Sequence, residues 1–437
     1  MGTEIQLRIG SVSLSYAKNF MGEDFGFLFQ AGDETRVRSD GINYEYYEEH
    51  PDEEDLATSE AAFVSPLSRV LRRIKLLGHT LDVARAEYQA LLQEWKEDSD
   101  DNNEPPSALL TFEEFCRLAC LFPISSLSSE YIEYDTPERA KVAQGRFADY
   151  VEKFERVPPN DNSDMYWSES SYLSAKLCIL SATSMLQIFG TSRENADAEV
   201  NWQFGLIVSA GWVSRENFQP GTTRAQTILV ATEGASDARV LRRALDLLRP
   251  DVTDFFRFID GEERHHFWGT GNLVKFAEGL VRIDVQNQVL FLLDNDAEGV
   301  EAYQKFQQLN LPVNMRAMLL PNLDELKSFP CRGPEGVSNC DINGRAAAIE
   351  CYLDLNLEQY PPARVTWTNY KKDMDAWHGA LEHKDSYMRH FLDQDVDSLK
   401  TGTYDSSKIF KLLDVLIHEA SILSGQNFNE TPAGPDQ

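Results

Sequence analysis

The spacing of apolar and polar residues changes character about halfway along the chain. Residues 1 to about 40 alternate apolar with polar side chains, which predicts a few short β-strands. The alternating apolar residues are Ile5, Leu7 and Ile9, then Phe25, Phe27 and Phe29. Helical spacing follows from Ser59 to Trp95, with further helices beyond it. The first half therefore predicts a small β-containing domain with an acidic linker over residues 1–58 and a helical domain over residues 59–220.

Two polar segments interrupt this half. Tyr44 to Asp55 is dominated by acidic residues, and Lys96 to Ser107 is rich in Asp, Asn and Pro. Both are predicted to be exposed linkers or loops. Helix starts are indicated by the capping-box pair Thr111 and Glu114 and by the dipeptide Thr136-Pro137.

Beyond residue 220 the pattern becomes strand, helix, strand. Short apolar runs predict strands at 226–232, 253–259, 287–293 and 312–320, and helical spacing predicts helices at about 236–248 and 298–309. Buried strands that alternate with helices are typical of a parallel sheet. We therefore expect an α/β domain with a Rossmann-like parallel sheet over residues 221–360, a C-terminal helical extension over 361–425 and a flexible tail over 426–437.

The composition limits the classes of function. The 437 residues carry a formal net charge of −30, whereas proteins that coat nucleic acid by electrostatics alone are normally basic. Two interpretations remain: bound metal ions supply positive charge, or a partner protein supplies regulation or a basic surface. The chain has no long apolar run and no recognisable secretory signal, and its six cysteines form no CxxC pair, which favours a reduced cytoplasmic protein that needs no membrane. Assembly into a homo-oligomer stays open.

Acidic residues directly follow two of the predicted strands. Glu233 to Asp237 reads EGASD, in which Ser236 is placed to cap the next helix and the final acid falls in its first turn. Asp294 to Asp296 reads DND and follows the strand at 287–293. Open α/β sheets bind ligands at the carboxyl ends of their strands, and clustered carboxylates repel one another unless a cation neutralises them. Since Mg²⁺ prefers oxygen ligands, the two motifs together predict a magnesium site.

These motifs resemble the signature of the TOPRIM domain, in which an apolar strand ends in a Glu-Gly turn and a later strand ends in DxD. The resemblance is carried by VATEGASD and LFLLDND. TOPRIM domains occur in topoisomerases, primases and nucleases, and the chain lacks the further modules that the first two classes need. The resemblance therefore implies an α/β TOPRIM fold and an endonuclease that hydrolyses phosphodiester bonds with Mg²⁺, or with Mn²⁺.

Within this superfamily the sequence resembles the OLD-like branch, in which a Glu and an Asp four residues later both bind metal. That branch has a further acid on a later helix, here Glu350 within residues 341–355, and a Lys beyond it, here Lys384. An exposed helical Glu and an ordinary surface Lys remain the alternatives. The resemblance implies the catalytic residues Glu233, Asp294, Asp296 and Lys384, and the metal ligands Glu233, Asp237, Asp294, Asp296 and Glu350.

The rest of the chain resembles, through less specific motifs, bacterial HEPN/Toprim-associated proteins. The stretches that carry this resemblance are GPEG to NGRAAAIE, WTNYKK and ALEHKDSYMRHFL. HEPN ribonucleases place an Arg and a His a few residues apart on one helix, and Arg73 with His79 is the nearest such pair. The group's genome-defence context implies an antiphage effector, and the family resemblance favours DNA over RNA as its substrate. A ribonuclease toxin acting on tRNA or rRNA, and a non-catalytic metal-binding subunit of a defence complex, are the alternatives.

A modest basic strip is also expected beside the acidic site. Its members would come from the region that follows the α/β domain: Arg364, Lys371, Lys372, Arg389 and Lys408.

Overall fold

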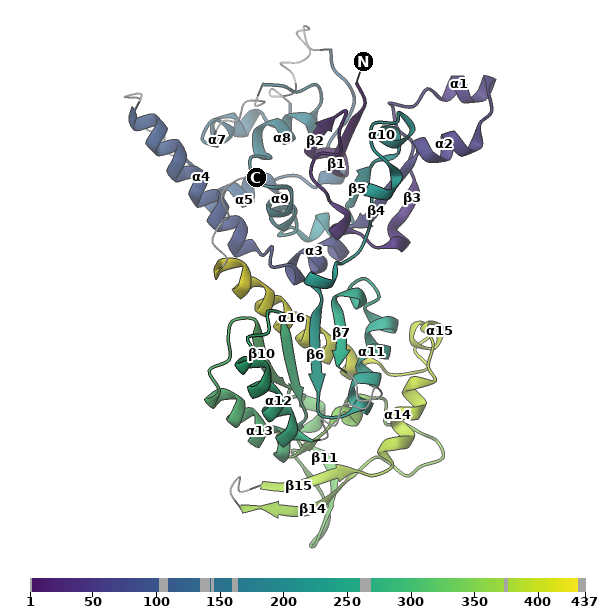
Figure 1. Cartoon of the computed structure of the whole chain (residues 1–437), viewed down its shortest axis with the longest axis vertical. Coiled ribbons are helices and arrows are strands. Elements are labelled where there is room, and N and C mark those ends of the chain that lie inside the picture. Colours follow the sequence, from purple (N-terminus) through teal and green to yellow (C-terminus); the bar gives the residue numbers. More distant parts are fainter. Residues whose placement is uncertain are drawn as a thin grey trace. The chain divides into compact units, whose positions relative to one another are not determined.

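The chain forms two compact units, Met1–Gly221 and Thr222–Gln437 (Figure 1). The computed structural model describes residues 2–101, 109–133, 142, 145–158, 164–259, 269–372 and 376–430. The division falls just after Pro220-Gly221, where the strand-helix-strand pattern begins.

The N-terminal unit is built on one antiparallel five-stranded sheet with the order β2-β1-β5-β4-β3. Its strands are β1 (Glu4–Ile9), β2 (Val12–Lys18), β3 (Glu34–Arg36), β4 (Ala61–Pro66) and β5 (Glu199–Gln203). Its helices are α1 (Tyr44–Glu49), α2 (Glu53–Ser59), α3 (Leu67–Leu76), α4 (Leu81–Asp101), α5 (Phe112–Ala119), α7 (Val151–Phe154), α8 (Glu169–Leu177), α9 (Ala182–Phe189) and α10 (Gly205–Ser209). The sheet thus combines strands from residues 1–58 with strands from residues 59–220.

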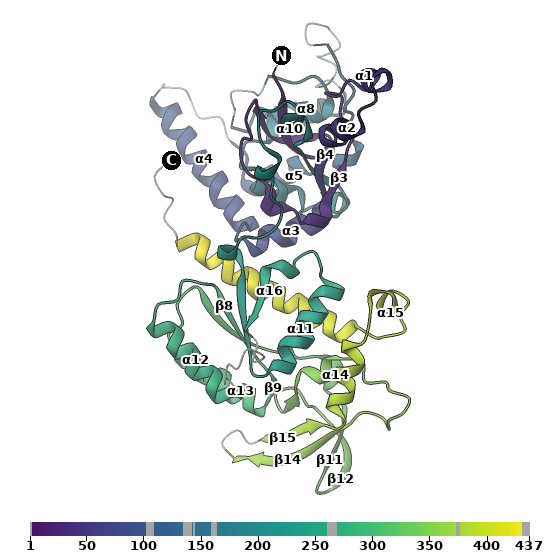
Figure 2. The same cartoon turned by 45° about the vertical axis from the view of Figure 1, so that its right-hand side comes forward.

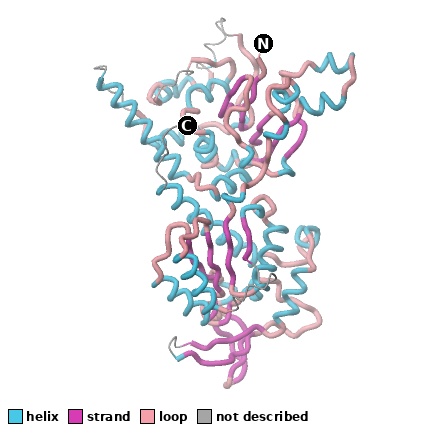
Figure 3. Tube along the Cα trace, in the orientation of Figure 1, coloured by secondary structure: helices cyan, strands magenta, loops and turns pink. Residues whose placement is uncertain are grey.

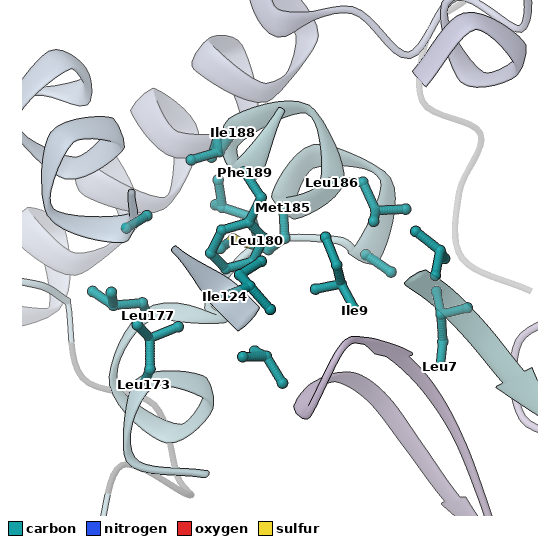
Figure 4. Packing of buried hydrophobic residues seen from close by; sticks show 14 of the residues in the cluster. Leu7, Ile9, Ile124, Leu173, Leu177, Leu180, Met185, Leu186, Ile188 and Phe189 are labelled. Carbon is teal, nitrogen blue, oxygen red and sulfur yellow. The ribbon is translucent and has the colours of Figure 1, made fainter. Parts of the chain in front are cut away.

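The core of this unit follows from the alternation in β1 and from the apolar character of α9. Leu7 and Ile9 point to the same side of β1 and are fully buried, as the period of two requires. Every residue of α9 is buried, and its apolar side chains lie close to those of β1 and α8 (Figure 4). This helix therefore lies in the middle of the unit.

The local structure of the N-terminal unit agrees with some of the sequence-based predictions and differs from others. The strands at residues 4–18 and the capping box of Thr111 with Glu114 are confirmed. The predicted strand around Phe25–Phe29 is wrong, because Gly26–Leu28 forms a 3-10 turn. The acidic segment Tyr44–Asp55 is helical rather than a loop: side chains of Asn43 and Asp52 cap α1 and α2. Thr136-Pro137 lies outside the described residues.

The C-terminal unit contains a four-stranded parallel sheet with the order β10-β8-β6-β7, which confirms the α/β prediction. Its strands are β6 (Ile228–Thr232), β7 (Phe256–Ile259), β8 (Val289–Leu293) and β10 (Met315–Leu319). The helices around it are α11 (Ala235–Leu248), α12 (Thr270–Arg282), α13 (Ala297–Gln308) and α16 (Ser407–Glu430). Apolar residues of α12 and α13 pack on Phe291 of β8, and α11 contacts α16 on the other side (Figure 2). The sequence pattern did not indicate α12.

A second sheet follows in the chain, with the order β12-β11-β14-β15 (Figure 3). Its strands are β11 (Phe329–Gly333), β12 (Gly336–Cys340), β14 (Val365–Lys371) and β15 (Ala376–Leu381). The predicted helical extension is therefore wrong over 365–381, where Thr and aromatic residues favour a strand. Helices resume with α14 (Lys384–Leu392), α15 (Val396–Lys400) and α16, the last of which runs on to Glu430 in the segment predicted as tail.

Among the described residues, no single helix is long and apolar enough to cross a membrane. Together, α8 and α9 meet the length and hydropathy criteria, but the pair is bent by 115°.

Candidate active site

The parallel pairing of β6 with β8 brings the two acidic motifs together. Thr232 pairs with Leu292, so Glu233 and Asp294 leave neighbouring strands at the same edge of the sheet. The backbone N–H of Asp294 donates a hydrogen bond of 3.1 Å to Oε1 of Glu233. Burial, reinforced by the charge of Asp296, raises the pKa of Glu233 to about 8. This carboxyl therefore holds its proton near neutral pH unless a cation replaces it.

Asp237 lies beside them in the first turn of α11. Its Oδ2 accepts a hydrogen bond from the N–H of Gly234 (3.0 Å), and its Oδ1 accepts one from the Ser236 hydroxyl (3.2 Å). Burial and the charge of Glu350 raise the pKa of Asp237 to about 6. The helix begins at Ala235, so the prediction that Ser236 caps it is wrong; Gly234 is the N-cap residue.

The DND motif places its two acids in different surroundings. Oδ1 of Asp294 accepts a hydrogen bond from the N–H of Ile349 (3.2 Å), and burial together with the neighbouring carboxylates holds its pKa well above the usual value. Asp296 is the N-cap of α13, where its Oδ1 accepts from the N–H groups of Glu298 (2.9 Å) and Gly299 (2.7 Å). Burial also raises the pKa of Asp296.

Glu350 reaches this group from a distant part of the chain. It is buried, and its charge raises the pKa values of both Asp237 and Asp294. Nζ of Lys384, at the start of α14, lies 3.8 Å from Oε1 of Glu350, and the Lys384 side chain is 54% exposed. The structure thus brings all six sequence-predicted site residues into one neighbourhood.

The helix predicted to carry Glu350 is absent, and this prediction is wrong. Glu350 sits in the 3-10 turn η11 (Ile349–Tyr352), after the short strand β13 (Ala346–Ala347). β13 pairs with β9 (Asn295–Asp296), and Gly344, at a positive φ of 72°, donates its N–H to the Asn295 side chain. These contacts with the DND segment override the helix preference of an alanine-rich sequence.

The donor set suits a hard divalent cation. In Glu233, Asp294 and Asp296, a backbone N–H donates to one carboxylate oxygen, which fixes the group and leaves the second oxygen available to a cation. In Asp237 the second oxygen accepts from the Ser236 hydroxyl, so a cation would share that oxygen with Ser236. Within the described part of the chain, however, no three His, Cys, Asp or Glu side chains already stand grouped so that they could hold a metal ion. To bind these residues, a cation would therefore have to draw their carboxylate oxygens inward.

One nearby residue was missed by the sequence reasoning. Nδ1 of His378, on β15, lies 3.7 Å from Oδ2 of Asp296. His378 is 82 positions from Asp296 in the chain, and no motif surrounds it. Only the docking of the second sheet against α13 and β13 brings the two together, so the sequence offered no usable signal.

Three members of the predicted basic strip make contacts within the unit itself. Lys408 is half-buried and its Nζ donates to the Cys351 carbonyl (2.8 Å), and partial burial lowers its pKa. Arg364 pairs with Glu382. Lys371 pairs with two glutamates of α13, Glu298 at 3.7 Å and Glu301 at 3.0 Å. These three side chains therefore stabilise contacts within the C-terminal unit.

The HEPN-like pair is also arranged differently from its prediction. Arg73 lies on α3, but that helix ends at Leu76 and His79 follows it, with its ring stacked on Phe27. The Arg73 guanidinium is fully buried and donates to the carbonyl of Phe29 (3.0 Å). An arginine used in this way supports the fold rather than facing a substrate.

Comparison with known proteins gives one result. Residues 1–226 match the model of the family described as HEPN/Toprim N-terminal domain 1. No curated protein and no solved structure matches the chain. Since the match covers more than half of the residues, the chain belongs to the HEPN/Toprim N-terminal domain 1 family.

Proposed function

We propose that the C-terminal unit is a TOPRIM-type catalytic domain and that the protein is a divalent-cation-dependent nuclease of the OLD-like kind. The observation that carries the proposal is the gathering of five carboxylates around the ends of two adjacent parallel strands. Four of these groups, Glu233, Asp237, Asp294 and Asp296, have pKa values raised by burial and by neighbouring carboxylates. Perturbed acids at the carboxyl edge of an α/β sheet are typical of functional sites.

The family supports the same class of activity. Its name joins HEPN and Toprim, which both denote domains that act on nucleic acids. The buried Arg73 gives no support to a ribonuclease site in the N-terminal unit, so we assign catalysis to the acidic group of the C-terminal unit.

Each residue has a distinct proposed role. Asp294, Asp296 and Glu350 would hold a Mg²⁺ or Mn²⁺ ion, and Asp237 would hold a second one. Such ions clamp a scissile phosphate and activate the attacking water. Glu233 would either bind metal or accept the water proton. Lys384, which is exposed and pairs with Glu350, would contact a phosphate oxygen.

The test is a cleavage assay on three substrates. Supercoiled DNA, single-stranded DNA and total RNA are incubated with the protein in Mg²⁺, Mn²⁺ or EDTA. We expect cleavage of DNA that requires the metal and is lost in Asp294→Asn and Asp296→Asn, which keep side-chain volume but remove a charge. The loss should exceed the roughly 10- to 100-fold effect typical of outer-shell residues. Glu358→Gln, at an exposed carboxyl, is the matched control.

The outcomes separate the alternatives. Cleavage confined to RNA would replace DNA by RNA as the substrate. Metal binding that is abolished by Asp294→Asn, with cleavage of none of the three substrates, would favour a non-catalytic metal-binding subunit. Cleavage that persists in EDTA would contradict the proposal.

A further inference from the structure

The hairpin of β14 and β15 is fixed against the helix that Asp296 caps. β15 contacts α13 and β13, and Lys371 of β14 pairs with Glu298 and Glu301 on the first turns of α13. The hydroxyl of Thr368 donates to the carbonyl of His378 across the hairpin (3.2 Å). The backbone that carries His378 is therefore held beside the acidic site both by the contacts of β15 and by the ion pairs of β14.

The ring of His378 faces Asp296 with an unsatisfied nitrogen. Its Nδ1 is buried and has no hydrogen-bond partner among the described residues. The nearest carboxylate oxygen is Oδ2 of Asp296, 3.7 Å away, and the two side chains are only 20% and 13% exposed. A buried polar atom without a hydrogen-bond partner lowers the stability of the fold. A conformation in which Nδ1 gains a partner is therefore favoured.

The chemistry of the two groups sets the direction of that hydrogen bond. Oδ1 of Asp296 is already held by two backbone N–H groups of α13, so Oδ2 is the oxygen left to move. An ionised carboxylate only accepts hydrogen bonds. Nδ1 must therefore carry the proton and donate, and a movement of Oδ2 by about 0.5–1 Å would bring it within hydrogen-bond distance.

We propose that His378 is a positioning residue of the acidic site: its Nδ1–H holds Oδ2 of Asp296 in the orientation that a divalent cation requires. This inference rests on the proposed function, since it assigns a partner to one of the proposed metal ligands. Hydrogen bonds to ligating carboxylates orient them, and loss of such a bond typically lowers metal affinity about 10- to 100-fold.

Two isosteric substitutions distinguish positioning from a general structural role. In His378→Asn, the amide nitrogen takes the place of Nδ1, whereas in His378→Gln it takes the place of Nε2. His378→Leu keeps bulk but removes both donors. We expect about a 10- to 100-fold weaker Mn²⁺ affinity for the Gln and Leu variants and an affinity within about threefold of the wild type for the Asn variant. His418→Asn, at an exposed position on α16, is the control.

The readouts are Mn²⁺ titration of the full chain by calorimetry and the metal concentration needed for half-maximal cleavage. Equal Mn²⁺ affinity in all His378 variants, with a wild type that binds Mn²⁺, would overturn the positioning role and leave the proposed function standing. A wild type that neither binds Mn²⁺ nor cleaves nucleic acid would instead overturn the proposed function. Equal weakening in the Asn, Gln and Leu variants would show that the intact ring, and not the Nδ1 donor, is what matters.

Discussion

The carboxyl groups at the sheet edge destabilise the fold when no cation is bound. Burial raises the pKa of Glu233 to about 8 and that of Asp237 to about 6, above their ordinary values of 4.5 and 3.8. A raised pKa in the folded state means that folding is favoured while these groups are protonated. Their contribution to stability is complete below the ordinary pKa values and is lost as the pH rises through the folded ones.

We therefore predict that the melting temperature in EDTA falls as the pH is raised from about 5 to about 8.5. Ca²⁺ or Mg²⁺ should flatten this dependence, because the cation takes the place of the protons. Glu233→Gln should flatten it as well, whereas the exposed control Glu358→Gln should not. A melting temperature that rises over this range in EDTA would mean that the acids are stabilised as anions by groups of the protein itself. Thermal unfolding followed by circular dichroism provides the measurement.

Individual site residues could be predicted from the sequence only where they lie next to a recognisable strand. Glu233, Asp237, Asp294 and Asp296 were predicted as site residues because each follows a recognisable apolar strand within a few positions. His378 was missed because its relation to Asp296 depends on how a second sheet docks, which no local spacing records.

Among the elements, η11 depends on α16 for its position. The half-buried Lys408, in the first turn of α16, donates a hydrogen bond from its ammonium to the carbonyl of Cys351, next to Glu350. Tyr404, just before α16, accepts a hydrogen bond at its hydroxyl from the N–H of Asp354 (2.9 Å). The start of the C-terminal helix therefore holds the turn that brings Glu350 to the site.

Lys408→Met should remove this support while keeping the length of the side chain. The Cys351 carbonyl would lose its partner, so we predict a free energy of unfolding lower by about 1–3 kcal/mol, together with weaker Mn²⁺ binding. Urea unfolding and Mn²⁺ titration measure the two effects. Lys400→Met, at an exposed lysine on α15, should change neither. Unchanged Mn²⁺ affinity in Lys408→Met would show that Glu350 keeps its position without the hydrogen bond from Lys408 to the Cys351 carbonyl.

Helices and strands could be predicted where the spacing of apolar residues was regular and uninterrupted. The four parallel strands, α11 and α13 were placed within a few residues of their observed bounds, because their apolar runs are continuous. The helix expected around Glu350 failed, since pairing of Ala346 and Ala347 with the DND segment outweighs helix propensity. The hairpin at 365–381 was missed because helical spacing was extended across a segment whose residues favour strands.

For the whole molecule, the separation into two compact units predicts an independent C-terminal fold. A fragment of residues 222–437 should be folded, with one cooperative thermal transition and a mixed α/β circular dichroism spectrum. Its parallel sheet is covered by α12 and α13, which belong to the same unit. Aggregation of the fragment under conditions in which the full chain stays dispersed would show that the N-terminal unit is needed to cover its core.

The net charge of −30 leads to a second prediction at this scale. Without a divalent cation, the carboxylates at the sheet edge repel phosphate, so affinity for nucleic acid should be weak in EDTA. Ca²⁺ should restore binding without cleavage, because its loose coordination supports metal-ion hydrolysis poorly. Asp294→Asn should abolish the Ca²⁺ response in a filter-binding or fluorescence-anisotropy titration. Tight binding in EDTA that this substitution leaves unchanged would place the nucleic acid on another surface.

The order of the site residues along the chain has a consequence for synthesis. The acidic group takes its members from β6 near Glu233, β8 near Asp294, η11 at Glu350 and the start of α14 at Lys384, and Lys408 secures η11. A ribosome that has translated only as far as Asp296 has made the two acidic motifs but neither Glu350 nor Lys384. On the proposed function such a nascent chain would hold an incomplete metal site, so the order of the gene itself would delay activity until translation has passed α16.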